Sequence, residues 1–497
     1  MDLTMSKQQF DVIIIGAGLG GLTSGALLAN QGVKVLMLEQ HSVVGGCASS
    51  FRRKKFVFDS AVHLIGGLEE GGIPYEILNE LKIQNNLEIC QLSSMYTIQV
   101  GKEKIELPKN IEILEQFLIS ISPSDEEAII DTLQEIKEIG SSLLTMKLTK
   151  RSHGLIMAIQ NLSIKQYLAD RFINAKIEFI FLSLFPYIGA VPEQIPAPFY
   201  MATFMSYNGG GYYVKGSSQA LSNALKTSFE RGGGQILMRR RVEEILYRDN
   251  KIVGVRDHKG NEYEAPHVIS NMDVRKTLLS MIDQKNLPSA LVKEVKEVIP
   301  SISGIILYVA IENDGWERNL PHETFIFPNY KNHQSCNAYN PLDSDSKPWL
   351  TVSCTTHIDP SLAPEGHSII SILAPCEEKV IEQIREEKGK EFIEERFWEL
   401  LDFYIPGLRE RAVFYEMATP RTVERYTGNG NGAIYGWKKS IDQQMKIESI
   451  SRLLIPGLHI VGHWSKYGHG VFGAMNGGRL LATVLKEAIS SQISPVS

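Results

Sequence analysis

Three glycines near the start of the chain are spaced to hold the phosphates of a dinucleotide. Gly16, Gly18 and Gly21 form a GxGxxG motif, and Glu39 follows Gly21 by 18 positions. In this motif the first glycine permits a tight turn, the second lets backbone approach a pyrophosphate, and the third lets a helix pack on a strand. An acid at the position of Glu39 accepts hydrogen bonds from an adenosine ribose. The pattern predicts a dinucleotide site.

A second pair of glycines indicates which dinucleotide this is. Gly45 and Gly46 follow Glu39 closely, where their backbone N–H groups would reach further along a longer cofactor. The sequence contains no second strand–GxGxxG–helix unit, so a dedicated NAD(P)H domain is not expected. We therefore expect FAD as the cofactor, with a quinone or oxygen as the electron acceptor.

A glycine-rich segment near the C-terminus predicts the contact with the flavin ring. A buried strand is expected to end at Gly462, and Gly470 and Val471 begin the last helix. The N-terminus of a helix offers free N–H donors and partial positive charge, which would stabilise negative charge on a reduced flavin. Further upstream, Val242 lies in a predicted strand whose backbone is expected to meet the adenine.

Several titratable side chains could transfer protons beside such a cofactor. His63, His463 and Glu424 are the candidates for catalytic residues. For His63 the alternative is a structural histidine, hydrogen-bonded near the flavin. Because His459, His463 and His469 have neither regular ligand spacing nor neighbouring acids, no metal site is predicted.

The elements that must position these residues are typical of an α/β protein. Apolar runs over 12–15 and 33–38 flank a helical pattern, as in a strand–helix–strand unit of a parallel sheet. Similar material returns far downstream, over 216–271. We therefore predict a Rossmann-like FAD-binding domain that is discontinuous, and an inserted α+β substrate domain that carries one long helix over 377–403.

The two domains are expected to alternate along the chain in five segments. The FAD-binding domain takes residues 1–80, 210–300 and 421–497, and the substrate domain takes residues 81–209 and 301–420.

The most apolar part of the chain, residues 176–213, is crowded with aromatic side chains and interrupted by prolines. One interpretation is a buried core helix that breaks at Pro186. The other is the lining of a cavity for a long apolar ligand, or a patch that contacts a bilayer. Because prolines are frequent and charges are few, the segment favours a shaped cavity, so an apolar small molecule is the expected substrate.

Composition and charge narrow the class of protein. The 497 residues are 43% hydrophobic and 22% charged, as in a protein of two or three domains, and a formal charge of -6 does not indicate nucleic-acid binding. Five scattered cysteines and the lack of a signal-peptide pattern predict a cytoplasmic location. No run reaches the ~20 apolar residues of a spanning helix, so a peripheral membrane contact is the alternative to a purely soluble protein. The basic run 52–55 is expected to cap a hairpin.

Taken together, the two ends of the chain resemble the phytoene desaturase, carotenoid isomerase and retinol saturase family of FAD-dependent oxidoreductases. The resemblance is carried by VIIIGAGLGGL, FDSAVHLIGG, GSSQALSNAL, TPRTVERYTGNGNGAIYG and PGLHIVGHWSKYGHGVFGAMNGGRLLA. It implies a Rossmann-like FAD domain, a substrate domain with an apolar tunnel and peripheral attachment to membranes. His63 matches the histidine of the family's FDxxxH segment, whereas His463 stands where the family usually has an acid.

The expected function follows from this resemblance. It is an FAD-dependent oxidoreductase that acts on a long apolar polyene, of carotenoid or retinoid type, through hydride chemistry at flavin N5. Desaturation, saturation and redox-neutral cis–trans isomerisation share such a site. Two other functions stay open: a flavin oxidase, related to amine oxidases or to flavoproteins of secondary metabolism, with a polar or carrier-bound substrate, and a non-catalytic flavoprotein that binds lipids or polyenes.

Overall fold

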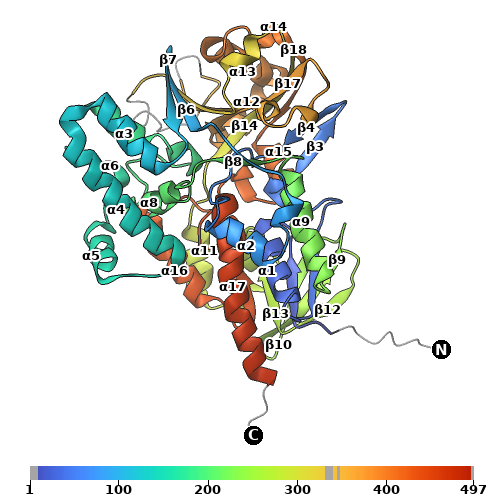
Figure 1. Cartoon of the computed structure of the whole chain (residues 1–497). Coiled ribbons are helices and arrows are strands. Elements are labelled where there is room, and N and C mark those ends of the chain that lie inside the picture. Colours follow the sequence, from blue (N-terminus) through green and yellow to red (C-terminus); the bar gives the residue numbers. More distant parts are fainter. Residues whose placement is uncertain (1–8, 331–339, 344–346, 494–497) are drawn as a thin grey trace.

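The computed structural model describes residues 9–330, 340–343 and 347–493 (Figure 1). Two large sheets organise these residues, and each sheet collects strands from distant parts of the chain. In Figure 1 the long helix α17 (Gly470–Ile493) runs down one side of the part that holds the first sheet, and the second sheet lies above it.

The first sheet is parallel and contains the predicted strand–helix–strand unit. Its strand order is β19-β13-β1-β2-β9. The strands are β1 (Val12–Ile15), β2 (Val35–Leu38), β9 (Gln235–Leu237), β13 (His267–Ser270) and β19 (Leu458–Ile460). Because all five run in the same direction, the loops after β1, β2, β13 and β19 lie at one edge of the sheet, which is where open α/β sheets bind ligands.

Successive residues of β1 pack against different layers, as the alternation of side chains along a strand requires. Val12 and Ile14 belong to a core shared with α1 (Leu19–Ala29), α9 (Ser218–Arg231) and α17. Ile13 and Ile15 belong to a core on the other face, which a second group of elements covers. That group consists of β10 (Val242–Arg248), β11 (Lys251–Asp257), β12 (Glu262–Glu264), α10 (Val274–Leu279), α11 (Ser289–Glu297) and α16 (Ile441–Leu453).

The second sheet has seven strands in the order β18-β14-β17-β16-β15-β6-β7, and only its β15–β6 pair is parallel. The strands are β6 (Ser94–Val100), β7 (Glu103–Pro108), β14 (Ser303–Glu312), β15 (Glu323–Phe327), β16 (Leu350–Ser353), β17 (His367–Cys376) and β18 (Ala412–Ala418). Strands β6 and β7 precede β9 in the chain and strands β14 to β18 follow β13, yet all seven meet in one sheet. The exact domain boundaries stay a prediction.

The single long helix predicted over 377–403 is wrong, because the segment forms two helices. These are α12 (Glu378–Lys388) and α13 (Lys390–Tyr404), and Gly389 separates them. Gly389 has a φ of 87°, which breaks a right-handed helix and which glycine adopts without the steric penalty of a Cβ atom.

The aromatic segment over 176–213 is mainly core. It contributes α7 (Ala175–Leu182) and α8 (Ala197–Met205), and α8 packs beside α4 (Glu126–Thr145). Phe179, Phe181, Phe185, Tyr200 and Phe204 are at most 3% exposed, so these rings do not form a bilayer-facing patch. Tyr187 and Tyr207 are only partly buried and line a cavity, so both the core and the cavity interpretations hold for parts of the segment.

Shorter elements complete the described chain. The basic run 52–55 forms the end of β3 (Ser50–Arg53) and the turn of the predicted hairpin, which leads into β4 (Phe56–Asp59). The other strands and α-helices of the described chain are α2 (Ile73–Glu80), β5 (Ile89–Gln91), α3 (Ile111–Ile121), α5 (Lys150–Ile159), α6 (Ile164–Leu168), β8 (Tyr212–Val214), α14 (Leu408–Arg411) and α15 (Pro420–Thr427).

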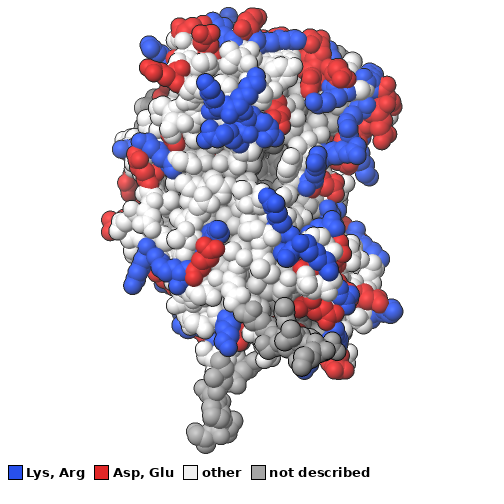
Figure 2. Space-filling model, turned by 90° about the vertical axis from the view of Figure 1, so that its right-hand side faces the viewer, with Lys and Arg blue, Asp and Glu red and all other residues white. Residues whose placement is uncertain are grey.

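The surface carries charges of both signs (Figure 2), and the described cysteines are free thiols. On the face in Figure 2, groups of basic and acidic side chains are scattered around a broad area of other residues. Cys47, Cys90, Cys354 and Cys376 are free thiols, and Cys336 lies outside the described residues. None of the described helices combines the length and the apolar composition that crossing a membrane requires.

Candidate active site

The loops at the carboxyl edge of the first sheet enclose a hollow, which we call the cofactor cavity. It contains most of the residues predicted to bind a dinucleotide. Its wall includes Gly16, Gly18, Glu39, Gly45, Gly46, Val242, Gly462, His463, Gly470 and Val471.

The glycines of the first loop are required by close contacts. Gly16 has a φ of 93°, which turns the chain out of β1. A Cβ atom on Gly18 would lie 2.6 Å from Nδ2 of Asn271, so a side chain there would enter occupied space. Gly21 lies beneath the cavity, where a Cβ atom would collide with the carbonyl oxygen of Gly16. It therefore serves helix–strand packing, as the motif predicts.

Glu39 ties two loops of the cavity together. Its carboxylate is 6% exposed and accepts hydrogen bonds from the N–H of Ala17 at 2.7 Å and from the N–H of His41 at 2.8 Å. Each carboxylate oxygen keeps a further lone pair after this bond. Its contact with a ribose stays a prediction, but the structure adds a second role, which is to hold the glycine loop in place.

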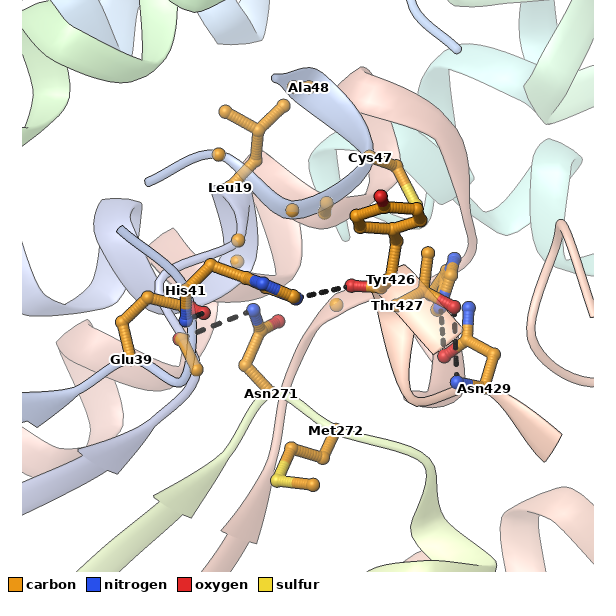
Figure 3. Close-up of a pocket in the computed structure, with 18 of the residues that line it drawn as sticks. Leu19, Glu39, His41, Cys47, Ala48, Asn271, Met272, Tyr426, Thr427 and Asn429 are labelled. Carbon is orange, nitrogen blue, oxygen red and sulfur yellow. Dashed lines mark hydrogen bonds between the residues drawn. The ribbon is translucent and has the colours of Figure 1, made fainter. Parts of the chain in front are cut away.

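Residues that sequence reasoning missed close the cavity from the opposite side (Figure 3). Nε2–H of His41 donates to the carbonyl oxygen of Tyr426, at the end of α15, at 2.6 Å. Asn271 follows β13 and lies between the glycine loop and α15. Asn271 ends a predicted parallel strand, and Tyr426, Thr427 and Asn429 lie in the segment TPRTVERYTGNGNGAIYG that carries the family resemblance. Arg240 and Arg241, whose basic run is typical of a solvated strand edge, and Met272 also lie in the wall.

His463 lies in the wall of the cofactor cavity, but as a neutral group. Burial, and then the positive charge of Lys439, lower the pKa of His463 to about 4. Nε2 of His463 lies 3.4 Å from Oδ1 of Asn429, which accepts a shorter hydrogen bond from Nε1–H of Trp464 at 2.8 Å. At neutral pH this histidine is therefore a hydrogen-bonding group without charge.

The donor set of the cavity fits FAD. Two helices, α1 and α17, begin in its wall, and helix N-termini favour negative charge. The glycine loop leaves backbone exposed to a pyrophosphate, and a Cβ atom on Gly470 would meet nothing within 4 Å, so space is open in front of α17. Val242 and Gly462 lie in the same wall, and their contacts with the adenine and the flavin stay predictions.

A second cavity adjoins the first through a shared wall. Both cavities are bordered by Ala61, Val62, Ile434, Tyr435, Gly470 and Val471. The second cavity is otherwise lined by side chains from the FDSAVH segment, the aromatic segment, the second sheet and the start of α17. They include Asp59, His63, Tyr187, Tyr207, Ile306, Tyr308, Thr351, Leu373 and Phe472.

His63 is held by a buried carboxylate in this second cavity. Nδ1 of His63 lies 2.7 Å from Oε2 of Glu323, which is 2% exposed and also accepts a hydrogen bond from Oγ of Ser353 at 2.7 Å. Burial lowers the pKa of His63, but Glu323 and then Asp59 overcome this effect and raise it above its usual value. Since Glu323 occupies Nδ1, the nitrogen left for a ligand is Nε2.

Glu424 does not reach either cavity. It lies on α15 with its side chain 40% exposed, and it pairs with Nζ of Lys276 at 3.1 Å, outside the described lining of both hollows. This position gives no support to the predicted catalytic role of Glu424. Across the described part of the chain, no group of three or more His, Cys, Asp or Glu side chains is arranged to hold a metal ion.

Curated relatives match almost the whole chain at low identity. The all-trans-retinol 13,14-reductase of Homo sapiens is 24% identical over 98% of this chain and 87% of its own length. Prolycopene isomerase 1 of an Oncidium hybrid cultivar is 24% identical over 96% of this chain and 83% of its own. The 4,4'-diaponeurosporene oxygenase of Staphylococcus haemolyticus is 25% identical over 86% of this chain and 87% of its own. These relatives confirm the resemblance drawn from the sequence.

Solved structures share the fold. A putrescine oxidase superposes with a TM-score of 0.67 at 15% identity, over 97% of this chain and 99% of its own. An oxidoreductase from Methanosarcina mazei superposes with a TM-score of 0.64 at 18% identity, over 96% of this chain and all of its own. The family model for flavin-containing amine oxidoreductases matches residues 19–485. The chain therefore belongs to the flavin-containing amine oxidoreductase family and is an FAD-dependent oxidoreductase.

Proposed function

We propose that this enzyme acts on a long, conjugated apolar molecule of the carotenoid or retinoid class, by desaturation, saturation or cis–trans isomerisation. The observation that carries the proposal is the wall shared by the two cavities, since Tyr435, Gly470 and Val471 border both. A ligand in the second cavity would lie against the end of the cofactor cavity where α17 begins. The names of the relatives, a retinol reductase and a prolycopene isomerase, support this class of substrate.

We assign the parts of the cofactor cavity as the motifs predict. Bound FAD supplies the hydride chemistry, and the protein must bind it, orient the substrate and exclude water. In this proposal the glycine loop holds the pyrophosphate, Glu39 the ribose and Val242 the adenine. The flavin end is formed by Gly462, Gly470 and Val471.

We assign proton transfer to His63. Because Glu323 fixes Nδ1, His63 can hold a proton at Nε2 beside the substrate, and a positioned acid or base typically contributes about 10²–10⁴-fold to a rate. His463 is not chosen, because its pKa is lowered to about 4 and it is hydrogen-bonded within the other cavity. Apolar and aromatic side chains such as Ile306, Tyr308 and Leu373 would orient the substrate and keep water away.

The test is anaerobic turnover of polyenes by the FAD-loaded protein. Liposomes carrying a mixed set of carotenoids and retinoids are added, and the flavin spectrum and the products are followed. If the flavin bleaches while the polyene chromophore lengthens, the reaction is desaturation. If reduced, bleached flavin is reoxidised while the polyene chromophore shortens, the reaction is saturation. Products of unchanged mass mean isomerisation. If no polyene changes while amines are oxidised with release of peroxide, the proposal is wrong and the flavin-oxidase alternative holds.

A quinone or oxygen is the electron acceptor that we propose for the oxidative direction. The support is the lack of a second dinucleotide motif in the sequence. Photoreduced enzyme should be reoxidised by a soluble quinone or by air, and not by NADP⁺.

We also propose that the enzyme meets its apolar substrate at a membrane surface. Met146, Leu148 and Met157 are 61%, 56% and 53% exposed at the end of α4 and on α5, and Lys147, Lys150 and Arg151 lie among them. Exposed apolar residues next to basic ones favour contact with anionic lipid. Sedimentation with anionic vesicles should be weakened by L148E/M157E and unchanged by V413E, which alters an exposed apolar residue on β18.

A further inference from the structure

We propose that the substrate of the second cavity carries an oxygen function, a hydroxyl or a carbonyl, at the end of its apolar chain that reaches His63 and Tyr207. This inference rests on the proposed function. It narrows the substrate class from polyenes in general to oxygenated ones.

The first observation is a pair of hydrogen-bonding groups without protein partners. The Tyr207 hydroxyl forms no hydrogen bond with any residue that the structure describes. Nε2 of His63 is equally free within the described chain, because the histidine's partner, Glu323, lies at Nδ1. Both residues line the second cavity. The ring of Tyr187 connects them, with ring centroids 6.3 Å from His63 and 6.1 Å from Tyr207.

Two other phenols at this cavity already have partners within the protein. The Tyr308 hydroxyl donates to the carbonyl oxygen of Ser60 at 2.7 Å. The Tyr435 hydroxyl donates to the carbonyl oxygen of Pro186 at 3.0 Å. The fold thus satisfies these two hydroxyls internally, whereas Nε2 of His63 and the hydroxyls of Tyr207 and Tyr187 have no hydrogen-bond partner among the described residues and are left for a ligand.

The protonation of the free groups decides what kind of ligand fits. Burial, and then the carboxylate of Glu323, raise the pKa of Tyr207, so its hydroxyl keeps its proton. The pKa of His63 is raised as well, which favours a proton on Nε2. Both groups line the same cavity, on either side of the Tyr187 ring, and a ligand oxygen can accept a hydrogen bond from the Tyr207 hydroxyl or from a proton on Nε2 of His63. An ammonium group offers no lone pair to such donors, so the cluster does not suit an amine.

A hydrocarbon end would leave these donors unpaired in the second cavity. A buried donor that loses its partner weakens binding by roughly 5- to 150-fold. Sites built to bond a hydroxyl discriminate strongly against the analogue that lacks it, because the site's own polar groups are then left unsatisfied. We therefore expect the cavity to select an oxygenated polyene over the hydrocarbon of equal length.

The experiment compares two ligand pairs that differ by one oxygen. The first pair is all-trans-retinol and the hydrocarbon with CH₃ in place of its CH₂OH group, and the second is β-cryptoxanthin and β-carotene. Equilibrium binding to the FAD-loaded enzyme is measured from the shift of the polyene absorption band. In at least one pair, the oxygenated member should bind roughly 10- to 100-fold more tightly.

Matched variants test whether the affinity ratio of the two ligands depends on Tyr207 and His63. Y207F removes a free hydroxyl and should lower the affinity ratio at least about fivefold while leaving the hydrocarbon's affinity unchanged or improved. Y308F removes a hydroxyl that already has a partner in the same cavity, and it should leave the ratio as in the wild type. H63L should lower the ratio as Y207F does, with the flavin still bound.

The outcomes separate this inference from the proposed function. If both members of each pair bind or react equally well, or if Y207F and H63L leave the ratio intact, the inference is overturned and the polyene function stands. If neither pair binds while the flavin site is full, the proposed function fails, and the inference fails with it.

Discussion

The cofactor cavity and the second cavity share a wall but are built from different material. Backbone dominates the first, where Gly16, Gly18, Gly45 and Gly46 keep side chains away from the ligand. Side chains dominate the second, where a buried His63–Glu323 pair lies among phenols. A site made of backbone depends on spacing and tolerates little added volume. A site made of side chains depends on which residues the fold brings together, and it can be changed without losing the cofactor.

The largest effect expected from this difference is loss of FAD on adding volume to the glycine loop. In G18V the new side chain would occupy the space of Asn271 Nδ2, which would lie only 2.6 Å from the added Cβ atom. Flavin content, measured as absorbance near 450 nm per protein, should fall at least about tenfold, since a valine side chain would stand where the backbone of the loop must approach the pyrophosphate. G154V is the control, because a Cβ atom on Gly154 in α5 meets nothing within 4 Å. Full flavin occupancy in G18V would contradict the site assignment.

The second prediction concerns a variant that keeps its flavin but loses activity. H63F should retain its flavin but lose about 10²–10⁴-fold in kcat, the range for removal of a general acid or base. His258 is exposed and its side chain belongs to neither lining, so H258F should match the wild type. An H63F enzyme with normal kcat would show that proton transfer does not take place at this histidine.

A third prediction concerns pH. The carboxylate of Glu323 raises the pKa of His63, so E323Q should lower that pKa. The limb of the kcat–pH profile that depends on His63 should move to lower pH in E323Q, whether the active form is protonated or neutral. S353A removes a hydrogen bond to the same carboxylate without removing its charge, and it should shift the limb less. An unchanged profile in E323Q would mean that another group sets the limb.

The smallest effect expected is on stability, and it contrasts two histidines of the second cavity. Burial, and then the charge of Lys439, lower the pKa of His469 to about 3, the opposite direction from His63. A lowered folded-state pKa gives stability that is complete above the ordinary value near 6.5 and is lost as pH falls. Between pH 7 and pH 5, His469 should account for about 2 kcal/mol of lost stability.

H469Q tests this prediction by thermal unfolding at both pH values. The amide of glutamine can still donate to the carbonyl oxygen of Tyr187, as Nε2–H of His469 does at 2.8 Å. The drop in Tm between pH 7 and pH 5 should therefore be smaller in H469Q than in the wild type. H258Q alters an exposed histidine and should keep the full drop; equal drops in all three proteins would rule the prediction out.

The same difference explains how much could be predicted from the sequence. The β1–α1–β2 unit and its glycines are local, so strand and helix periodicity and the motif spacing were sufficient to find them. The partners of the second cavity are not local, since His63 follows β4 whereas Glu323 begins β15, and nothing near either residue marks the other. The contact of His41 with Tyr426 spans 385 positions and was missed for the same reason.

One expectation without structural support and one wrong expectation have simple physical causes. Glu424 was chosen because it lies in a segment that does reach the cofactor cavity, through Tyr426 and Thr427. The side chain of Glu424 itself is 40% exposed and pairs with Lys276 instead of reaching the lining. The single helix over 377–403 overlooked Gly389, whose break is visible in the sequence once glycine's freedom at positive φ is considered.

The cofactor cavity joins parts of the chain that are made at very different times. Gly20 and Gly462 approach so closely that a Cβ atom on Gly20 would lie 2.6 Å from the backbone nitrogen of Gly462. On the ribosome, the GxGxxG loop emerges several hundred residues before the segment that completes its wall. A nascent chain therefore cannot offer FAD its finished binding site. Cells short of riboflavin should accumulate full-length polypeptide without flavin. The lifetime of this apoprotein would depend on how fast proteases cleave it before FAD binds beside α17.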